Sequence, residues 1–330
     1  MGRTELADWT PIRLDFSGPA PAVWWADLSG ERFTDPFFDQ TVARWESGPT
    51  ARPLVRTGLD ELEGLDGAPS LDPAGMIFHL SRCGSTLVSR LLGTQPGIVV
   101  VAEPAPLNSL LGLDPAHVDP ASLVKAVRLL VRALGRRRHG DERHLVLKCT
   151  SWNIVRREVL AAAFPKTPWI WVQRDPVRVL ASLLAEPPGW LAPRADLVKA
   201  APLFGIDPTL VPGMRRAEFA SRALAAMLEA AADQPAGRLV VDYADLPDAV
   251  WARVAPHFGL EIGAGAIDRM AEQSRFYSKD PTPRPFARGA VEERPVSETT
   301  REIAEQFAGP GYRALDSVEL TRATVPRDEG

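Results

Sequence analysis

The sequence predicts an α/β protein: a three-layer sandwich with a mostly parallel central sheet and a phosphate-binding turn like that of P-loop proteins. Two observations predict this fold. Short apolar runs alternate with amphipathic stretches from Gly75 onward, and a turn of small residues follows the first run. With 330 residues, 45% hydrophobic and 24% charged, the chain has the length and composition of one large globular domain or two small ones.

The first 70 residues differ from the rest. They are rich in turn formers and aromatic residues and show no long helical or strand period. We therefore interpret 1–70 as an irregular N-terminal extension of a domain formed by 71–330. Its large aromatic side chains are expected to be buried on the domain or at a substrate or dimer contact. These aromatic residues are Trp9, Trp24, Trp25, Phe33, Phe37, Phe38 and Trp45.

The elements of the domain follow in order. Predicted strands are Met76–Leu80, Ile98–Val101, His144–Leu147, Trp169–Gln173 and Arg238–Val241. Predicted helices are Leu123–Leu134, Ile154–Ala163, Pro176–Ala185, Glu218–Ala231, Ala249–Phe258 and Ile267–Gln273, with a last short helix around Ile303 and Phe307. Asp175 before Pro176 is a good helix start. The prolines between 187 and 213 oppose continuous regular structure, so this stretch is predicted to be a loop-rich lid or substrate segment.

Charge and cysteine content exclude several classes of protein. A net charge of -4 gives no general attraction to nucleic acid or an anionic membrane, so phosphate chemistry must rest on local basic residues. Two cysteines, Cys83 and Cys149, are too few for a disulfide scaffold and lack zinc-site spacing, and they favour a reducing compartment. Since we find no signal peptide and no membrane span, we expect a cytoplasmic protein. Because the cysteines lack zinc-site spacing, we expect no metal. The basic run Arg136–His139 is interpreted as a solvated helix end.

The segment 76–92 consists of an apolar strand, a tight turn and an amphipathic helix. This order directs unpaired amides and the positive helix end at one point, and Gly84 allows an anion to approach the backbone closely. Ser85 and Thr86 add hydroxyl donors, and Arg82 adds a permanent cation. The Walker A pattern is absent, because the basic residue precedes the glycine.

The turn Ser81-Arg82-Cys83-Gly84-Ser85-Thr86-Leu87 resembles the 5′-phosphosulfate loop of sulfotransferases, in which a serine usually occupies the place of Cys83. The strand and helix of 169–184, with Arg174-Asp175-Pro176 between them, resemble the 3′-phosphate segment of the same family. The resemblance implies that 82–87 bind the 5′ end of 3′-phosphoadenosine 5′-phosphosulfate and that Arg174 and Ser182 bind its 3′-phosphate. It implies the same contact, more faintly, for Arg288 in Phe286-Ala287-Arg288-Gly289.

Glu103 and Lys148 each follow or end a predicted strand and are expected at the same edge of the sheet as the loop. The resemblance implies that Glu103 is the general base, as in the branch that includes the tyrosylprotein enzymes. It also implies that Lys148, with Arg82, stabilises charge on the leaving phosphate or the sulfuryl group. His79, inside the first strand, is interpreted as a core histidine and not as a base.

The resemblance implies a sulfotransferase that acts on a small-molecule or peptide acceptor, and it leaves a homodimer open. One alternative is an atypical P-loop kinase using ATP and Mg²⁺, with Asp242 as metal ligand. The other is a nucleotide-binding module without catalysis. Neither the acceptor nor the role of the extension follows from the sequence.

Overall fold

The computed structural model describes residues 6, 9–65, 69–192, 195–233, 237–276, 278–279, 284–285 and 295–315. A five-stranded sheet runs through this part of the chain. Its strands are β4 (Pro73–His79), β5 (Ile98–Ala102), β6 (His144–Lys148), β7 (Trp169–Gln173) and β8 (Arg238–Asp242). The order is β5-β6-β4-β7-β8, and every neighbouring pair is parallel. Each predicted strand is confirmed, with small shifts at its ends.

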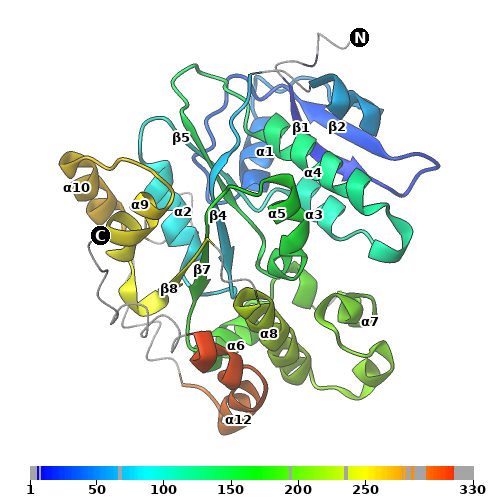
Figure 1. The fold of residues 1–330 in the computed structure, drawn as a ribbon, viewed down its shortest axis with the longest axis vertical. Helices are drawn as coiled ribbons and strands as arrows, with labels where there is room; N and C mark the ends of the chain where they lie inside the picture. The colour runs from blue at the N-terminus through cyan, green and yellow to red at the C-terminus, as the bar shows by residue number, and fades with distance from the viewer. Residues whose placement is uncertain are drawn as a thin grey trace, which may run out of the picture.

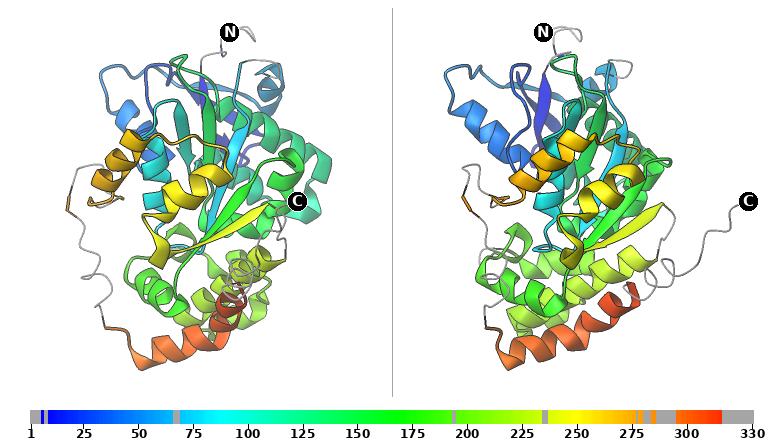
Figure 2. Two further views of the ribbon diagram at one scale, coloured as in Figure 1. Left: turned by 60° about the vertical axis from the view of Figure 1, so that its left-hand side comes forward. Right: turned by 90° about the vertical axis from the view of Figure 1, so that its left-hand side faces the viewer.

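Helices cover both faces of this sheet. They are α2 (Ser85–Gly93), α3 (Ala105–Leu111), α4 (Pro120–Leu134), α5 (Arg157–Ala163), α6 (Pro176–Ala185), α7 (Leu197–Ala200), α8 (Arg216–Ala232), α9 (Ala255–His257), α10 (Ala264–Gln273) and α12 (Glu298–Phe307). In Figure 1, α2, α9 and α10 lie on one side of the sheet and α3, α4 and α5 on the other. The predicted three-layer α/β fold is therefore confirmed. Helix α12 packs against α8 and α6 (Figure 2).

Local signals explain where several helices begin and end. The Asp175 carboxylate accepts a hydrogen bond from the Val177 amide at 2.8 Å, and α6 spans the predicted residues. The helix predicted to begin at Ile154 instead begins as a 3-10 helix over Ser151–Arg156 and becomes α-helical in α5. The described part of the proline-rich stretch forms only short helical turns, as the prolines predict. These turns are Gly189–Leu191, Leu197–Ala200, Ala201–Phe204 and Pro208–Gly213.

The interpretation of the N-terminal extension as irregular is wrong. Its described residues form an antiparallel sheet of β1 (Thr10–Asp15), β2 (Ala22–Ala26) and β3 (Val55–Gly58), together with helix α1 (Phe38–Glu46). The strands are short, and β2 is covered on both sides, so no alternation of polar and apolar residues marks it. The expected burial of aromatic residues is found for Trp25, Phe38 and Trp45.

The basic run after α4 is not a solvated helix end, because two of its arginines turn inward and hold the extension. The Arg136 guanidinium donates to the Leu6 carbonyl at 3.0 Å, and that of Arg138 donates to Thr10 Oγ1 at 3.1 Å. The Arg138 guanidinium also lies 4.3 Å from the centre of the Phe33 ring. The two guanidinium groups are therefore surrounded by protein groups and not by water. The sequence pattern does not distinguish these two environments.

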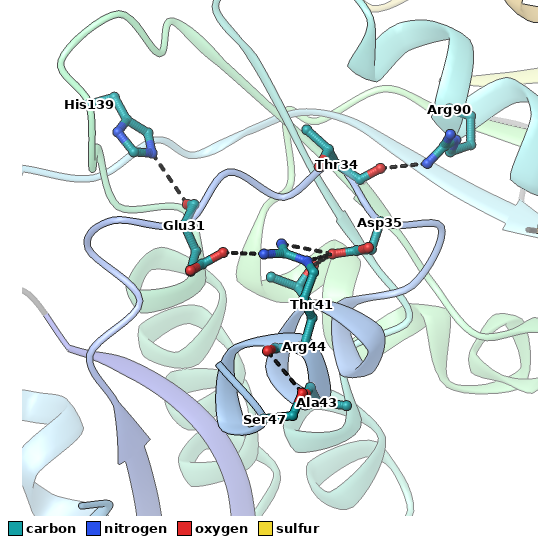
Figure 3. Close-up of polar contacts among 9 residues, drawn as sticks. All are labelled: Glu31, Thr34, Asp35, Thr41, Ala43, Arg44, Ser47, Arg90 and His139. Atoms are coloured by element: carbon teal, nitrogen blue, oxygen red, sulfur yellow. Dashed lines mark hydrogen bonds and ion pairs between the residues drawn. The ribbon is translucent and has the colours of Figure 1, made fainter. Parts of the chain in front are cut away.

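A polar network fixes the turn that leads into α1 (Figure 3). Arg44 pairs with Glu31 at 2.5 Å and with Asp35 at 2.9 Å, and Thr41 Oγ1 donates to Asp35 at 2.8 Å. Arg90, on α2, donates to the Thr34 carbonyl. The network joins the extension to the helix that follows β4, and so determines where the next residues, beginning at Pro36, lie on the domain.

Candidate functional site

The carboxyl ends of four strands meet at one edge of the sheet. The β4–α2 loop (residues 80–84) follows β4, Glu103 follows β5, Lys148 ends β6 and Arg174 follows β7. Strand β4 lies between β6 and β7, so the chain connections diverge on either side of it. In open parallel sheets, a crevice for ligands forms at such a point.

The backbone of the β4–α2 loop is unusual. Ser81 and Arg82 have φ values of 71° and 50°, in the left-handed region that residues with side chains rarely occupy. Gly84 has φ 88° and is the N-cap of α2, where it has no side chain to satisfy the first helical amides. A Cβ at Gly84 would lie 2.7 Å from Leu246 Cδ1 and 2.9 Å from Tyr243 Cδ2, so only glycine fits. Helical amides that no side chain caps, beside a bare backbone, suit an anion.

Cys83 anchors this loop to the sheet. Its thiol is fully buried and donates to the Val172 carbonyl at 3.1 Å. Burial raises the pKa of the Cys83 thiol to about 11, so it stays neutral and unreactive at physiological pH. The Cys83 side chain therefore points toward β7, while the hydroxyl side chains of Ser85 and Thr86 are largely buried at the start of α2.

Arg82 and Ser182 are brought together from the loop and from α6. The Arg82 Nε donates to Ser182 Oγ at 2.8 Å, and the far end of the guanidinium pairs with Glu186. Arg174, whose exposed fraction is 8%, lies with its guanidinium 4.2 Å from the centre of the Tyr243 ring. The two arginines thus stand on the loop and on the end of β7, and Leu87 is half-buried on α2 just beyond the loop.

Glu103 and Lys148 form an ion pair at the ends of neighbouring strands. The Lys148 ammonium is fully buried and donates to Glu103 Oε1, and the Glu103 amide donates to the Lys148 carbonyl at 2.7 Å. Glu103 has φ 53° and is the third non-glycine residue at this edge in the left-handed region. Such strained residues cluster at functional sites.

The electrostatics of the pair favour the charged form of Glu103. Burial alone would raise the pKa of its carboxyl, but the charge of Lys148 and the nearby His79 outweigh burial and lower the pKa to about 2. His79 Nε2 lies 3.5 Å from Glu103 Oε1 and 3.1 Å from the Cys149 carbonyl. His79 is buried, as predicted, but it touches the candidate site and not only the core.

Three further residues, which the sequence analysis did not identify as site residues, lie close to the Glu103–Lys148 pair. The Phe37 ring lies 5.1 Å from the Lys148 ammonium, and the Asp39 carboxylate accepts a hydrogen bond from the Ala105 amide beside Glu103. Burial lowers the pKa of the Lys279 ammonium to about 8, and the nearby charges of Arg82 and Lys148 contribute to this shift. These residues come from the extension and from the chain after α10, and the only signal was an aromatic beside an acid at 37–39.

Arg288, the remaining predicted phosphate ligand, lies outside the described residues. Within the described part of the chain, no three His, Cys, Asp or Glu side chains are grouped so that they could hold a metal ion. No helix in that part combines the length and the apolar character required to cross a membrane.

Fold and site together define a three-layer α/β protein. At the carboxyl edge of its sheet it has a glycine-containing loop, two arginines and a buried lysine–glutamate pair. No known protein family and no curated protein matches its sequence.

Among solved structures, the chain is similar to a sulfotransferase from Mycobacterium avium, with 14% identity over 75% of this chain and 79% of the other and a TM-score of 0.45. It is also similar to a sulfotransferase from Alicyclobacillus acidocaldarius, with 15% identity over 75% and 96% of the two chains and a TM-score of 0.43. A third is the sulfotransferase domain of the Synechococcus olefin synthase, with 15% identity, 73% and 96% coverage and a TM-score of 0.41.

Proposed function

We propose that this chain is a sulfotransferase that transfers a sulfuryl group from 3′-phosphoadenosine 5′-phosphosulfate to a hydroxyl or amine acceptor. The observation that carries the proposal is the charge pattern at the carboxyl edge of the sheet. Lys148 pairs with Glu103, and the charges of Arg82, Lys148 and Glu103 all act on Lys279, beside a loop whose helix start has no side-chain cap. Side-chain cations there supply the positive charge that a nucleotide donor requires.

The residues at this edge fit the donor. The amides at the start of α2, with Ser85 and Thr86, would hold its 5′ end, because no side chain caps the start of this helix. Arg174 and Ser182 would bind the 3′-phosphate, with Arg82 bridging from the loop to Ser182. Arg288 would add a further contact. Cys83 would contribute its amide only, since its thiol is held by Val172.

In the proposed reaction the acceptor oxygen or nitrogen forms a bond to sulfur as the bond from sulfur to the leaving phosphate breaks. Glu103 takes the acceptor proton, and Lys148 stabilises the negative charge that collects on the phosphate. As in phosphoryl transfer, positioning and electrostatics do most of the work. Because Phe37 contacts Lys148 and Asp39 accepts from the Ala105 amide near Glu103, we propose that the extension contributes contacts to the acceptor.

The kinase alternative is less well supported, because both oxygens of Asp242 already have protein partners. One accepts from the Ala244 amide at 2.9 Å and the other from the Tyr312 hydroxyl at 2.8 Å. These bonds hold both oxygens of Asp242 in the absence of a metal ion. Glu103 is held by an ammonium and not by groups that would accompany a metal ion.

The test is a thermal-shift titration followed by a transfer assay. Saturating 3′-phosphoadenosine 5′-phosphate should raise the melting temperature by several degrees, and ATP with Mg²⁺ should raise it much less. The Glu103→Gln variant should keep this shift and lose most transfer of labelled sulfate to a cell extract. A strong shift with ATP and Mg²⁺, and none with the 3′-phosphorylated nucleotide, would refute the proposal.

A further inference from the structure

We propose that His79 is a positioning residue for Glu103: its Nε2–H holds Oε1 of the carboxylate and leaves Oε2 to take the acceptor proton. The inference rests on the proposed function and concerns a residue that the mechanism above does not use. The buried His79 ring joins Ser81 of the β4–α2 loop to the carboxylate of Glu103.

The tautomer of His79 follows from its neighbours. The Ser81 amide donates to His79 Nδ1 at 3.1 Å, so Nδ1 carries a lone pair and the proton of the neutral ring is on Nε2. Two acceptors are near this N–H: Nε2 lies 3.1 Å from the Cys149 carbonyl oxygen and 3.5 Å from Glu103 Oε1. Burial, and then the charge of Lys148, lower the pKa of His79, which keeps the ring neutral.

His79 is poorly placed to be the base itself. Only 5% of the residue is exposed, its Nδ1 is occupied by Ser81, and its Nε2 already carries a proton. The side chain of Glu103, by contrast, is 23% exposed. Both protein partners of its carboxylate, Lys148 and His79, are on Oε1, and no hydrogen bond from the described residues reaches Oε2. The carboxylate is therefore held by one oxygen and open at the other.

A second hydrogen-bond donor to Glu103, the His79 N–H, matters if Lys148 also contacts the leaving phosphate. Its ammonium cannot stabilise charge on a leaving phosphate and hold Glu103 with undiminished strength at the same moment. When the Lys148 ammonium interacts with the phosphate, burial would raise the pKa of Glu103 and reduce the fraction of Glu103 that is charged. The His79 N–H remains with Oε1 and opposes that rise, so the carboxylate stays ionised in place.

Other charged groups face Glu103 from the elements packed around it. Lys148 lies on β6, Lys279 follows α10 and Asp39 is on α1. The two lysines lower the pKa of Glu103 and Asp39 raises it, since like charges oppose ionisation. None of these groups is altered when only His79 is changed, so variants at this position isolate its contribution.

Two variants separate the two ends of the ring. His79→Gln puts an amide N–H near the position of Nε2 and keeps the contact to Glu103. His79→Asn puts an amide oxygen near Nδ1, which keeps the contact to Ser81 and loses the one to Glu103. We expect His79→Asn to move the acid limb of the kcat profile up by about one pH unit, which is a loss of about tenfold below that limb that is recovered above it. His79→Gln should keep the wild-type limb.

An assay without turnover reads the same contact. The protein contains only five histidines, so ¹⁵N-histidine labelling, with His79→Gln to assign the signal, reports the ring directly. We expect a neutral Nε2–H tautomer from pH 5 to pH 8 and a change in the Nε2 shift in Glu103→Gln. An Nδ1–H tautomer, or a ring that titrates near its ordinary pKa, would overturn the inference.

The outcomes also separate this inference from the proposed function. If the wild-type protein is not stabilised by 3′-phosphoadenosine 5′-phosphate, the proposed function is wrong and the positioning role fails with it. If the nucleotide binds but His79→Asn and His79→Gln share one pH profile, only the role of His79 is refuted. Rescue by asparagine and not by glutamine would show that the ring acts on the loop through Ser81.

Discussion

Replacing Lys148 by methionine tests the energetics of the buried pair. The ammonium is fully buried and Glu103 is its ionic partner, so Lys148→Met leaves a largely buried carboxylate without its main counter-charge. Breaking a buried pair from one side costs 3–5 kcal/mol, and because 23% of the Glu103 side chain is exposed we expect the low end, about 3 kcal/mol. Urea unfolding followed by circular dichroism at pH 7.5 measures the loss.

The Lys148→Met/Glu103→Gln double variant completes the cycle. It removes both charges, so its loss should be about 2 kcal/mol smaller than the sum of the two single losses. Additive losses would refute the interpretation that the two charges stabilise each other. Since burial without the ammonium raises the pKa of Glu103, the folded Lys148→Met protein binds a proton more readily. Its deficit should therefore shrink as the pH falls from 7.5 to 5.

Three other predictions follow from single contacts. Gly84→Ala should lower the free energy of unfolding in urea by about 2 kcal/mol, because the new methyl group would clash with Leu246 and Tyr243. The control is Gly205→Ala, where φ is 64° but no atom lies within 4 Å, and we expect a loss of about 1 kcal/mol. Equal losses in the two variants would exclude the clash. Arg174→Ala should weaken binding of 3′-phosphoadenosine 5′-phosphate about tenfold and barely affect adenosine 5′-phosphate in calorimetry, and equal weakening would remove its assigned role. Burial raises the pKa of the Cys83 and Cys149 thiols, so a thiol-disulfide reagent at pH 8 should label neither in the native protein and both in urea, and rapid native labelling would contradict their burial.

The sequence predicted the sheet well because its strands are buried on both faces and therefore appear as continuous apolar runs, as in Trp169–Gln173. The proximity of Glu103 to Lys148 was also predictable, since the carboxyl ends of parallel strands share one edge. Phe37, Asp39 and Lys279 were not, because they reach the pair from distant segments without a pattern of their own. The inward turn of Arg138 was missed for another reason: a cation held by carbonyls and a ring face has the same sequence signature as one in water.

The ties between the two arginines after α4 and the extension have a consequence for the order of folding. Leu6 and Thr10 are bonded to residues 130 and 128 positions further along the chain. During synthesis, Leu6 and β1 therefore cannot form these contacts until the two arginines, more than a third of the way along the chain, have been made. Contacts of such long sequence separation form slowly, because loop closure must precede them. Strand β1 therefore completes its packing only after the sheet edge that carries Glu103 has been synthesised.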